Sequence, residues 1–445
     1  MSIITLASEK KCHSSHYFRA AILHFISEPK NINDDKAWQY FEDGLLEVVN
    51  GKVISVRQAS EALPSLPENA SVVDYSGSLI LPGFVDVHTH FPQAEMIASY
   101  GEQLLQWLEN YTFVTEQKYA EQAYANKMAE FFLDMLFCHG TTAAMVFSTV
   151  HKESVTALFN AANAKNMRLI TGKVLMDRNA PEALCDTAQS GYEESQALIE
   201  QWHGKGRLSY AVTPRFAPTS TPEQLTLAGK LLQQDSSLYM QTHLAENLDE
   251  NAWVKTLFPD AKDYLDVYEQ HGLMSTRSIF AHSIHLQERE YKSLAHHQAG
   301  VAYCPSANLF LGSGAFNMPT AQQYQLNVGL GSDVGAGTSL CLLNILSDAY
   351  KSQKVEGFTL NPFYSLYLAT LGGAKCLDLE DKIGNFEANK EADFVVWDLN
   401  ATPLMTMRNI HSHQLAEQLF SFIILGDDRA VVATYVNGQL AYERT

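Results

Sequence analysis

Two histidines one residue apart, His88 and His90, end the apolar stretch LILPGFVDVHTH at residues 79–90. Alternate residues of a strand point to the same side, so both imidazoles should face the interior of a fold, with Thr89 facing outward. A buried strand gains nothing from imidazoles at its end unless something binds them. Imidazole nitrogens are typical ligands of a borderline divalent metal such as zinc. The pair alone is weak evidence, because the chain contains 16 histidines.

Other polar residues also follow apolar runs. They are Arg215 after LSYAVTP, His243 in LYMQTHLAE with Glu246 just beyond it, His282 in SIFAHSI and Asp333 in GLGSDVGAG. Taken singly, His282 could be a core histidine bonded to the backbone, Asp333 a turn residue among glycines, and Arg215 a partner in a surface ion pair. If the runs are parallel strands, however, their ends meet at one rim, and imidazoles with a carboxylate there predict a metal site.

The middle of the chain alternates short apolar runs with longer helical patterns, which is typical of βα units and a parallel sheet. Eight such runs occur, and they are GFVDVHTH, TAAMVFS, RLITGKVLM, LSYAVTPRF, LYMQTHLAE, SIFAHSI, GVAYCPSA and NVGLGSDV. Eight strands interleaved with helices predict a (β/α)8 barrel, an α/β fold whose chemistry gathers at the carboxyl ends of the strands. A doubly wound sheet is the structural alternative.

The longest helical pattern covers residues 115–140, where Thr115 is placed to cap the start and Gly140 to end the helix. Its apolar stripe is expected to consist of Ala120, Ala123, Tyr124, Met128, Phe131 and Met135. Before and after the barrel, both ends of the chain read as short strands. Asn50-Gly51 and Asn437-Gly438 are two-residue hairpin signals there.

We therefore expect a small β-sandwich formed by both termini. The predicted divisions are 1–80 for its first part, 81–379 for the (β/α)8 barrel with the metal site and 380–445 for its second part.

The composition limits the partners. A formal net charge of −19 argues against a nucleic-acid partner, because phosphate binding relies on basic patches. No apolar run reaches the length of about 18 residues expected of a membrane-spanning helix. The six cysteines, Cys12 among them, are scattered without a C-x-x-C pair, which favours free thiols in a reducing compartment. The first residues lack a signal-peptide pattern, so a cytoplasmic location is expected.

With these residues in place, the chain resembles the amidohydrolase superfamily. PGFVDVHTH on the first barrel strand, histidines on the fifth and sixth and an aspartate on the eighth carry the resemblance. The superfamily's metal-bridging carboxylated lysine has no counterpart where Arg215 stands, which is similar to the single-metal deaminase branch. Within it, the chain resembles the guanine deaminase family over nearly its whole length. The matching segments are HFPQAEMIASYGEQLLQWLENYTFVTE, VLMDRNAPE, TPRFAPTS, QTHLAEN and CPSANLFLGSGAFN.

The resemblance implies roles for individual residues. The implied metal ligands are His88, His90, His243 and Asp333. Gln93 and Arg215 are implied as readers of the purine. The substrate should also touch Phe216, Ala245 and Glu246, together with the ligands His90, His243 and Asp333. Trp107 and Phe113 are either aromatic lining or core residues. One Zn²⁺ per subunit is expected, although Fe²⁺ suits the same ligands. The resemblance also implies a homodimer.

The expected reaction is the hydrolytic deamination of free guanine to xanthine and ammonia. A bound zinc lowers the pKa of its water from 15.7 to about 7 and so supplies hydroxide. Asp333, or His282, would take the proton of this water, and Glu246 would protonate the ring nitrogen N3 and then the leaving ammonia. The alternatives are a deaminase or dechlorinase of another purine-like or triazine ring, and an inactive scaffold on the same fold.

Overall fold

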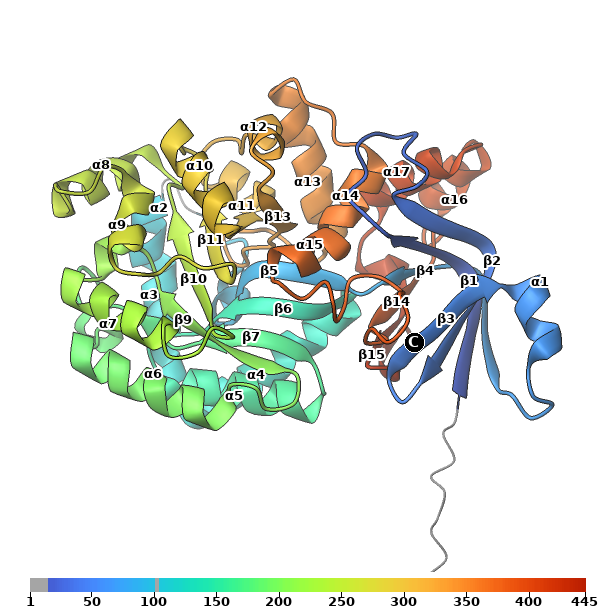
Figure 1. Cartoon of the computed structure of the whole chain (residues 1–445), viewed down its shortest axis with the longest axis horizontal. Coiled ribbons are helices and arrows are strands. Elements are labelled where there is room, and N and C mark those ends of the chain that lie inside the picture. The colour runs from blue at the N-terminus through green and yellow to red at the C-terminus, as the bar shows by residue number, and fades with distance from the viewer. Residues whose placement is uncertain (1–14, 101–103) are drawn as a thin grey trace, which may run out of the picture.

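The computed structural model describes residues 15–100 and 104–445. Cys12 and three residues of the segment after His90 lie outside this part. All eight predicted barrel strands are present, and they pair in parallel and in sequence order (Figure 1). They are β5 (Phe84–His90), β6 (Thr141–Phe147), β7 (Arg168–Gly172), β9 (Leu208–Pro214), β10 (Tyr239–Leu244), β11 (Ser278–His282), β12 (Gly300–Tyr303) and β13 (Asn327–Leu330). A short strand β8 (Val174–Leu175) also pairs with β9. The predicted barrel is confirmed, since a doubly wound sheet would reverse its strand order.

The first and last strands meet where the catalytic rim was expected. The amide of Asp333, just after β13, donates to the His88 carbonyl at 2.9 Å, and the amide of His90 donates to the Val334 carbonyl at 3.0 Å. These two bonds join the carboxyl end of β5 to the segment after β13. The nearly closed sheet therefore brings residues about 245 positions apart in sequence together at one rim.

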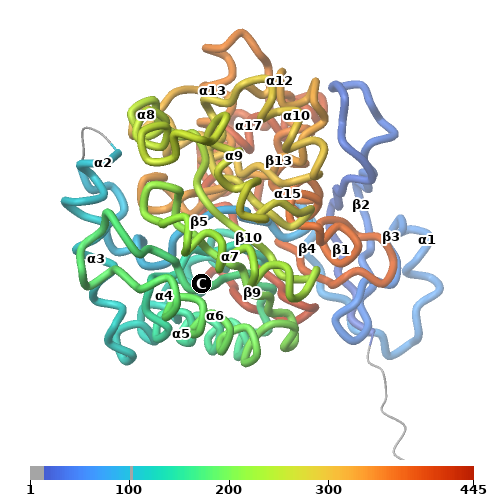
Figure 2. The backbone as a smooth tube through the Cα atoms, turned by 60° about the vertical axis from the view of Figure 1, so that its left-hand side comes forward, coloured from blue at the N-terminus to red at the C-terminus, as the bar shows by residue number. Residues whose placement is uncertain are grey.

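Helices surround this sheet. The main ones are α4 (Gln122–Cys138), α5 (Lys152–Ala164), α6 (Ala188–Trp202), α7 (Pro222–Leu232), α8 (Leu248–Leu257), α9 (Tyr264–Gln270), α10 (Glu288–His297), α11 (Pro305–Phe310), α12 (Met318–Gln323), α13 (Leu342–Val355), α14 (Pro362–Leu368) and α15 (Leu371–Cys376). Figure 2 shows α4, α5 and α6 side by side along one flank of the barrel. Within the described part of the chain, no helix combines the length and apolar character needed to span a membrane.

The helix expected over residues 115–140 begins later than predicted. Thr115 lies inside a short helix α3 (Phe113–Glu116), and a 3-10 turn (Gln117–Ala120) follows before α4. The cap is Glu121, whose extended backbone lets its carboxylate accept from the amides of Ala123 and Tyr124 at 3.0 and 2.7 Å. Gly140 ends the helix as predicted, with a φ of +81°.

The predicted apolar stripe of α4 is correct only in part, because Tyr124, Met128 and Met135 pack partly buried on the core, whereas Phe131 is 48% exposed. The buried side chains are Ala125, Ala129, Phe132, Leu133, Leu136 and Phe137. Apolar residues lie around more than one face of this helix, so the sequence pattern alone does not select the face that packs on the barrel.

Both termini contribute to one β domain, as predicted, and its seven strands are continuous in a mixed sheet. In sheet order they are β16 (Gln439–Glu443), β15 (Val431–Val436), β14 (Phe394–Trp397), β4 (Val72–Pro82), β1 (Ser15–Phe25), β2 (Trp38–Val49) and β3 (Lys52–Gln58). Strands β1 to β3 lie beside the barrel in both views (Figures 1 and 2). Gly83, the residue between β4 and β5, leads the chain from this terminal sheet into the barrel.

The two hairpin signals are confirmed. Asn50 and Gly51 connect β2 to β3 with φ angles of +51° and +75°, and Asn437 and Gly438 connect β15 to β16 with +50° and +74°. Positive φ at both central residues is the requirement of a type I′ turn, which Asn-Gly meets at little cost. Two further helices, α16 (Pro403–Ile410) and α17 (Leu415–Leu425), lie between β14 and β15. All five cysteines in the described part are free thiols.

A buried ion-pair network joins the barrel to the terminal sheet. Glu391, just before β14, accepts from Arg168 at the start of β7 at 2.6 and 2.9 Å. It also accepts from Arg207, just before β9, at 2.6 and 2.9 Å, and Arg207 donates in addition to Asp393. Both arginines stand at the amino ends of their strands, on the face of the barrel opposite the predicted rim.

Candidate metal and substrate site

Four imidazoles and a carboxylate converge at the carboxyl rim of the barrel. The Nε2 atoms of His88 and His90 are 3.3 Å apart, and each lies 3.2 Å from Asp333 Oδ1. His243 Nε2 lies 3.3 Å from His90 Nε2. The ligand atoms of His88, His243, His282 and Asp333 all lie within 4.8 Å of one another, and all four side chains are buried. The chain thus presents a buried histidine and aspartate group that can hold a metal ion.

The spacing fits a single small ion. Four ligands placed tetrahedrally at about 2.0–2.1 Å from zinc lie about 3.3 Å from each other. The measured separations among His88, His90, His243 and Asp333 are 3.2 to 3.3 Å where a contact joins them. Nitrogen lone pairs pack this closely without repulsion when a cation lies between them. The donor set, imidazoles with one carboxylate, is also the set that zinc and ferrous iron prefer.

The orientation of His243 is decided by the backbone. Its Nδ1 lies 2.7 Å from the carbonyl oxygen of Arg215, which can only accept, so Nδ1 carries the proton and Nε2 presents a lone pair to the cluster. Burial and the neighbouring imidazoles hold the pKa of His243 well below its usual range. Burial likewise lowers the pKa of His90 to about 3, although Asp333 opposes the shift. Both rings are therefore neutral, as metal ligands must be.

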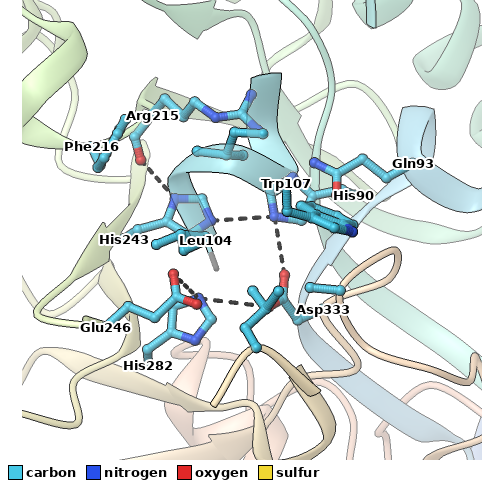
Figure 3. A pocket seen from close by; sticks show the side chains of 13 residues that line it. His90, Gln93, Leu104, Trp107, Arg215, Phe216, His243, Glu246, His282 and Asp333 are labelled. Atoms are coloured by element: carbon cyan, nitrogen blue, oxygen red, sulfur yellow. Dashed lines mark hydrogen bonds and ion pairs between the residues drawn. The ribbon is translucent and has the colours of Figure 1, made fainter. Parts of the chain in front are cut away.

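His282 connects the two acidic groups of the site. Its Nε2 lies 3.6 Å from Asp333 Oδ2 and 3.5 Å from Glu246 Oε2 (Figure 3). Its Nδ1 lies 2.8 Å from Asn308 Oδ1. The backbone alternative for His282 is thus wrong, because its partners are side chains. Asn308, on α11, fixes the ring so that Nε2 faces the two carboxyl groups.

The two carboxyl groups have opposite proton affinities. Burial, and then the negative charge of Asp333, raise the pKa of Glu246 to about 8, against a weaker effect of the hydrogen bond from Ser313. Burial would also raise the pKa of Asp333, but its contacts with His88 and His90 hold that pKa well below the usual range. A protonated and an ionised carboxyl group side by side are suited to acid and base roles respectively.

Asp86 supports the cluster from below. It lies two residues before His88 on β5, and its Oδ1 accepts from the amide of His88 at 3.2 Å and from the amide of Ser332 at 3.0 Å. Burial raises its pKa to about 6. The carboxyl group therefore ties the strand that carries the histidines to the loop that carries Asp333.

A pocket opens directly onto this group. It is lined by His90, Gln93, Leu104, Trp107, Leu108, Arg215, Phe216, His243, Glu246, His282, Leu311, Asp333 and Ala336. Figure 3 shows the polar side chains on opposite sides, with Arg215 and Gln93 across from Glu246 and His282. Trp107 is therefore a lining residue, which was one of the two roles that the sequence left open for it.

Phe113 takes the core alternative, and Ala245, which was expected to touch the substrate, lies outside the pocket lining. Phe113 is stacked behind Arg215, with the guanidinium carbon 5.7 Å from its ring centre, and Ala245 is buried with its carbonyl accepting from Ile284 and His285 at 3.1 Å. Neither residue lines the pocket.

The pocket residues Gln93 and Arg215 share a partner that the sequence reasoning missed. Glu116 is fully buried and accepts from Arg215 Nη1 at 2.8 and 3.0 Å and from Gln93 Nε2 at 3.2 Å. Arg215 is thus part of a buried ion pair rather than a surface one. The available signal was the position of Glu116, the acidic residue that ends the segment LENYTFVTE. Asp86 could have been found by extending the two-residue period of His90 and His88 by one step.

Comparisons with known proteins agree with this geometry. The profile of the amidohydrolase family matches residues 79–441. The guanine deaminase of Escherichia coli K12 is 49% identical over 433 residues, which cover 96% of this chain and 99% of the relative. The chain belongs to the guanine deaminase branch of the amidohydrolase family.

Solved structures of guanine deaminases share the whole architecture. The E. coli structure superimposes with a TM-score of 0.95, covering 97% of this chain and all of that one. The structure from Bradyrhizobium japonicum gives a TM-score of 0.93 at 34% identity, with the same coverage. The structure from C. acetobutylicum, which has guanine bound in its active site, gives 0.87 at 28% identity and covers 96% of this chain and all of that one.

Proposed function

We propose that this chain hydrolyses free guanine at C2, giving xanthine and ammonia. The observation that carries the proposal is a single pocket that has a buried metal-binding group on one side and the hydrogen-bond donors of Gln93 and Arg215 on the other. An enzyme acting on a 2-amino-6-oxopurine needs both parts. Membership of the guanine deaminase branch supports the same substrate.

We assign His88, His90, His243 and Asp333 as the residues that hold the metal, one ion per chain, with zinc preferred and ferrous iron as the alternative. Such an ion would supply a nucleophile at neutral pH by lowering the pKa of water to about 7. The carbonyl of Arg215 orients the ring of His243 from behind, and Asp86 holds the backbone of His88. Outer contacts of this kind are needed to keep ligands in place.

Recognition of the purine falls to Gln93, Arg215 and the aromatic side chains. The two polar residues would donate to O6 and N7, the acceptors on the edge of guanine away from its amine. Phe216 and Trp107 offer apolar surface for the ring faces. A base that presents a donor on that edge would leave buried donors unpaired, which costs roughly 1–3 kcal/mol for each group.

Proton transfers are divided between the two carboxyl groups. Asp333, ionised, accepts a proton from the attacking water. Glu246, with a pKa raised to about 8, holds a proton at neutral pH and gives it to N3, which makes C2 electrophilic. His282 lies between them, 3.6 and 3.5 Å from their oxygens, so it can pass a proton from Asp333 to Glu246 for the departing ammonia.

The direct test is ammonia release from guanine, adenine and melamine by the purified protein, together with a metal count. We expect release from guanine, xanthine as its product, and one metal per chain. Turnover of adenine or melamine in preference to guanine would select the alternative substrates, and absence of metal and of all turnover would select the inactive scaffold.

Glu246→Gln tests the acid and base assignment. The variant should retain the metal and lose about 10²–10⁴-fold in kcat, since proton transfer by a positioned group is worth that much. Glu288→Gln, a change at an exposed residue of α10, is the control and should retain wild-type kcat. A Glu246→Gln variant with wild-type kcat would remove Glu246 from the mechanism.

Two expectations derived from the sequence remain predictions. Light scattering coupled to size-exclusion chromatography would test the homodimer, and fractionation of the source cells would test the cytoplasmic location.

A further inference from the structure

The side chain of Glu116 is enclosed at the back of the pocket, where it contacts both proposed purine readers. It comes from α3, Gln93 from the turn after β5 and Arg215 from the end of β9. Glu116 Oε1 accepts from Gln93 Nε2 at 3.2 Å and from Arg215 Nη1 at 3.0 Å, and Oε2 accepts from Arg215 Nη1 at 2.8 Å. Glu116 does not itself line the pocket, so it acts on a ligand only through these two residues.

These contacts determine which way the Gln93 amide points. Its nitrogen faces a carboxylate, which can only accept, while its oxygen accepts from the amide of Gly335 at 3.2 Å, which can only donate. A flipped amide would place oxygen against oxygen and N–H against N–H. Gly335 can approach this closely because it lacks a side chain. A Cβ at this position would lie 2.7 Å from the backbone carbonyl oxygen of Gln93.

The consequence is a pocket edge made of donors. The Gln93 oxygen and one of its N–H groups are used by Gly335 and Glu116, so the group it can offer a ligand is its second N–H. Among the described residues, Arg215 pairs with Glu116 through Nη1 alone, which leaves Nη2 as a further donor. Arginine has no acceptor, and the Gln93 oxygen already accepts from the Gly335 amide, so neither residue turns an acceptor toward the pocket.

We propose that Glu116 is a positioning residue that sets the hydrogen-bond polarity of this pocket, so that it accepts 6-oxopurines and rejects 6-aminopurines. The inference rests on the proposed roles of Gln93 and Arg215 in guanine binding. A neutral amide in place of the carboxylate can donate as well as accept, so it removes one of the two contacts that orient Gln93. The Gly335 N–H alone then opposes the half turn that would present the Gln93 oxygen to a 6-amino group. Selectivity for the edge of the purine thus depends on a residue that does not touch it.

The test is Glu116→Gln, measured with guanine and with 2,6-diaminopurine, which carries an amine in place of O6. We expect the ratio of kcat/KM for guanine to that for 2,6-diaminopurine to fall at least about tenfold, because one buried hydrogen-bond mismatch is worth roughly that factor. Calorimetric binding of hypoxanthine and adenine, which needs no turnover, should show the same loss of preference. Metal content and thermal unfolding are recorded for each variant.

A ratio within threefold of the wild type would overturn the inference, whether activity on both substrates is unchanged or falls together, since a merely structural role lowers both equally. If Glu116→Gln does not fold, Glu116→Asp replaces it under the same criterion, because aspartate keeps a charge for Arg215 and withdraws the acceptor from Gln93. A wild-type protein that fails to release ammonia from guanine would refute the proposed function, while the hypoxanthine and adenine affinities would still decide the role of Glu116.

Discussion

Replacing Glu391 with glutamine removes the carboxylate that joins the barrel to the terminal sheet. Its side chain is 9% exposed and holds four hydrogen bonds of 2.6 to 2.9 Å from Arg168 and Arg207. Burial alone would raise its pKa, but the two guanidinium groups outweigh burial and lower the pKa from 4.5 to about 2. The variant leaves Arg207 with Asp393 as its acidic partner and Arg168 with none that the described residues show.

The size of the effect follows from this shift. Each pKa unit corresponds to about 1.4 kcal/mol, so a shift from 4.5 to about 2 contributes about 3 kcal/mol to the free energy of unfolding at pH 7. This value agrees with the cost of about 3–5 kcal/mol that is typical when one partner of a buried ion pair is removed. Because the pKa in the folded state is the lower one, the contribution is complete above pH 4.5 and is lost as the pH falls toward 2. At pH 3 roughly half of it should remain.

Urea denaturation of the metal-loaded protein, followed by tryptophan fluorescence at pH 7 and pH 3, measures this difference. Glu288→Gln removes an exposed carboxylate 2.6 Å from Lys292 and serves as the control, with an unfolding midpoint equal to that of the wild type. kcat for guanine should be unchanged in both variants, since the network lies on the face opposite the pocket. A Glu391→Gln midpoint equal to that of the control, or a difference that does not shrink at pH 3, would contradict a stabilising role for this ion-pair network.

Three further outcomes are expected. His88→Ala should purify with little metal by mass spectrometry and without guanine turnover, and stoichiometric metal with full activity would contradict the ligand assignment. Treatment with a chelator should abolish ammonia release and lower the unfolding temperature, since a ligand that binds only the folded state stabilises it, and added zinc or ferrous iron should restore both. Gly140→Ala should destabilise by more than roughly 1–2 kcal/mol, because the residue has a φ of +81° and its Cβ would lie 2.8 Å from Trp397. Gly204 also has a positive φ of +74°, but an added Cβ there would meet no other atom, so Gly204→Ala measures the cost of the backbone conformation alone. Equal urea midpoints for the two variants would exclude a steric contribution at Gly140.

Most of the fold could be predicted because its signals are local. Each barrel strand is a short apolar run followed by a polar residue, and each Asn-Gly pair meets the φ requirement of its own turn. The prediction failed for the start of α4, where helix propensity continues through residues 115–121 but the backbone is extended at Glu121. Propensity is a weak guide there, because packing of the preceding short helices against the rim decides where the long helix begins.

The two-residue period of a strand was sufficient to predict that His88 and His90 face the same way, and parallel strand order was sufficient to predict that the polar residues after the apolar runs meet at one rim. The contacts among these side chains could not be predicted in this way. Glu116 meets Arg215 across 99 positions and Asp86 meets Ser332 across 246. Such contacts cannot be predicted from the periodicity of a single strand or helix. They depend on closure of the barrel and on how the segment after β5 folds over the pocket.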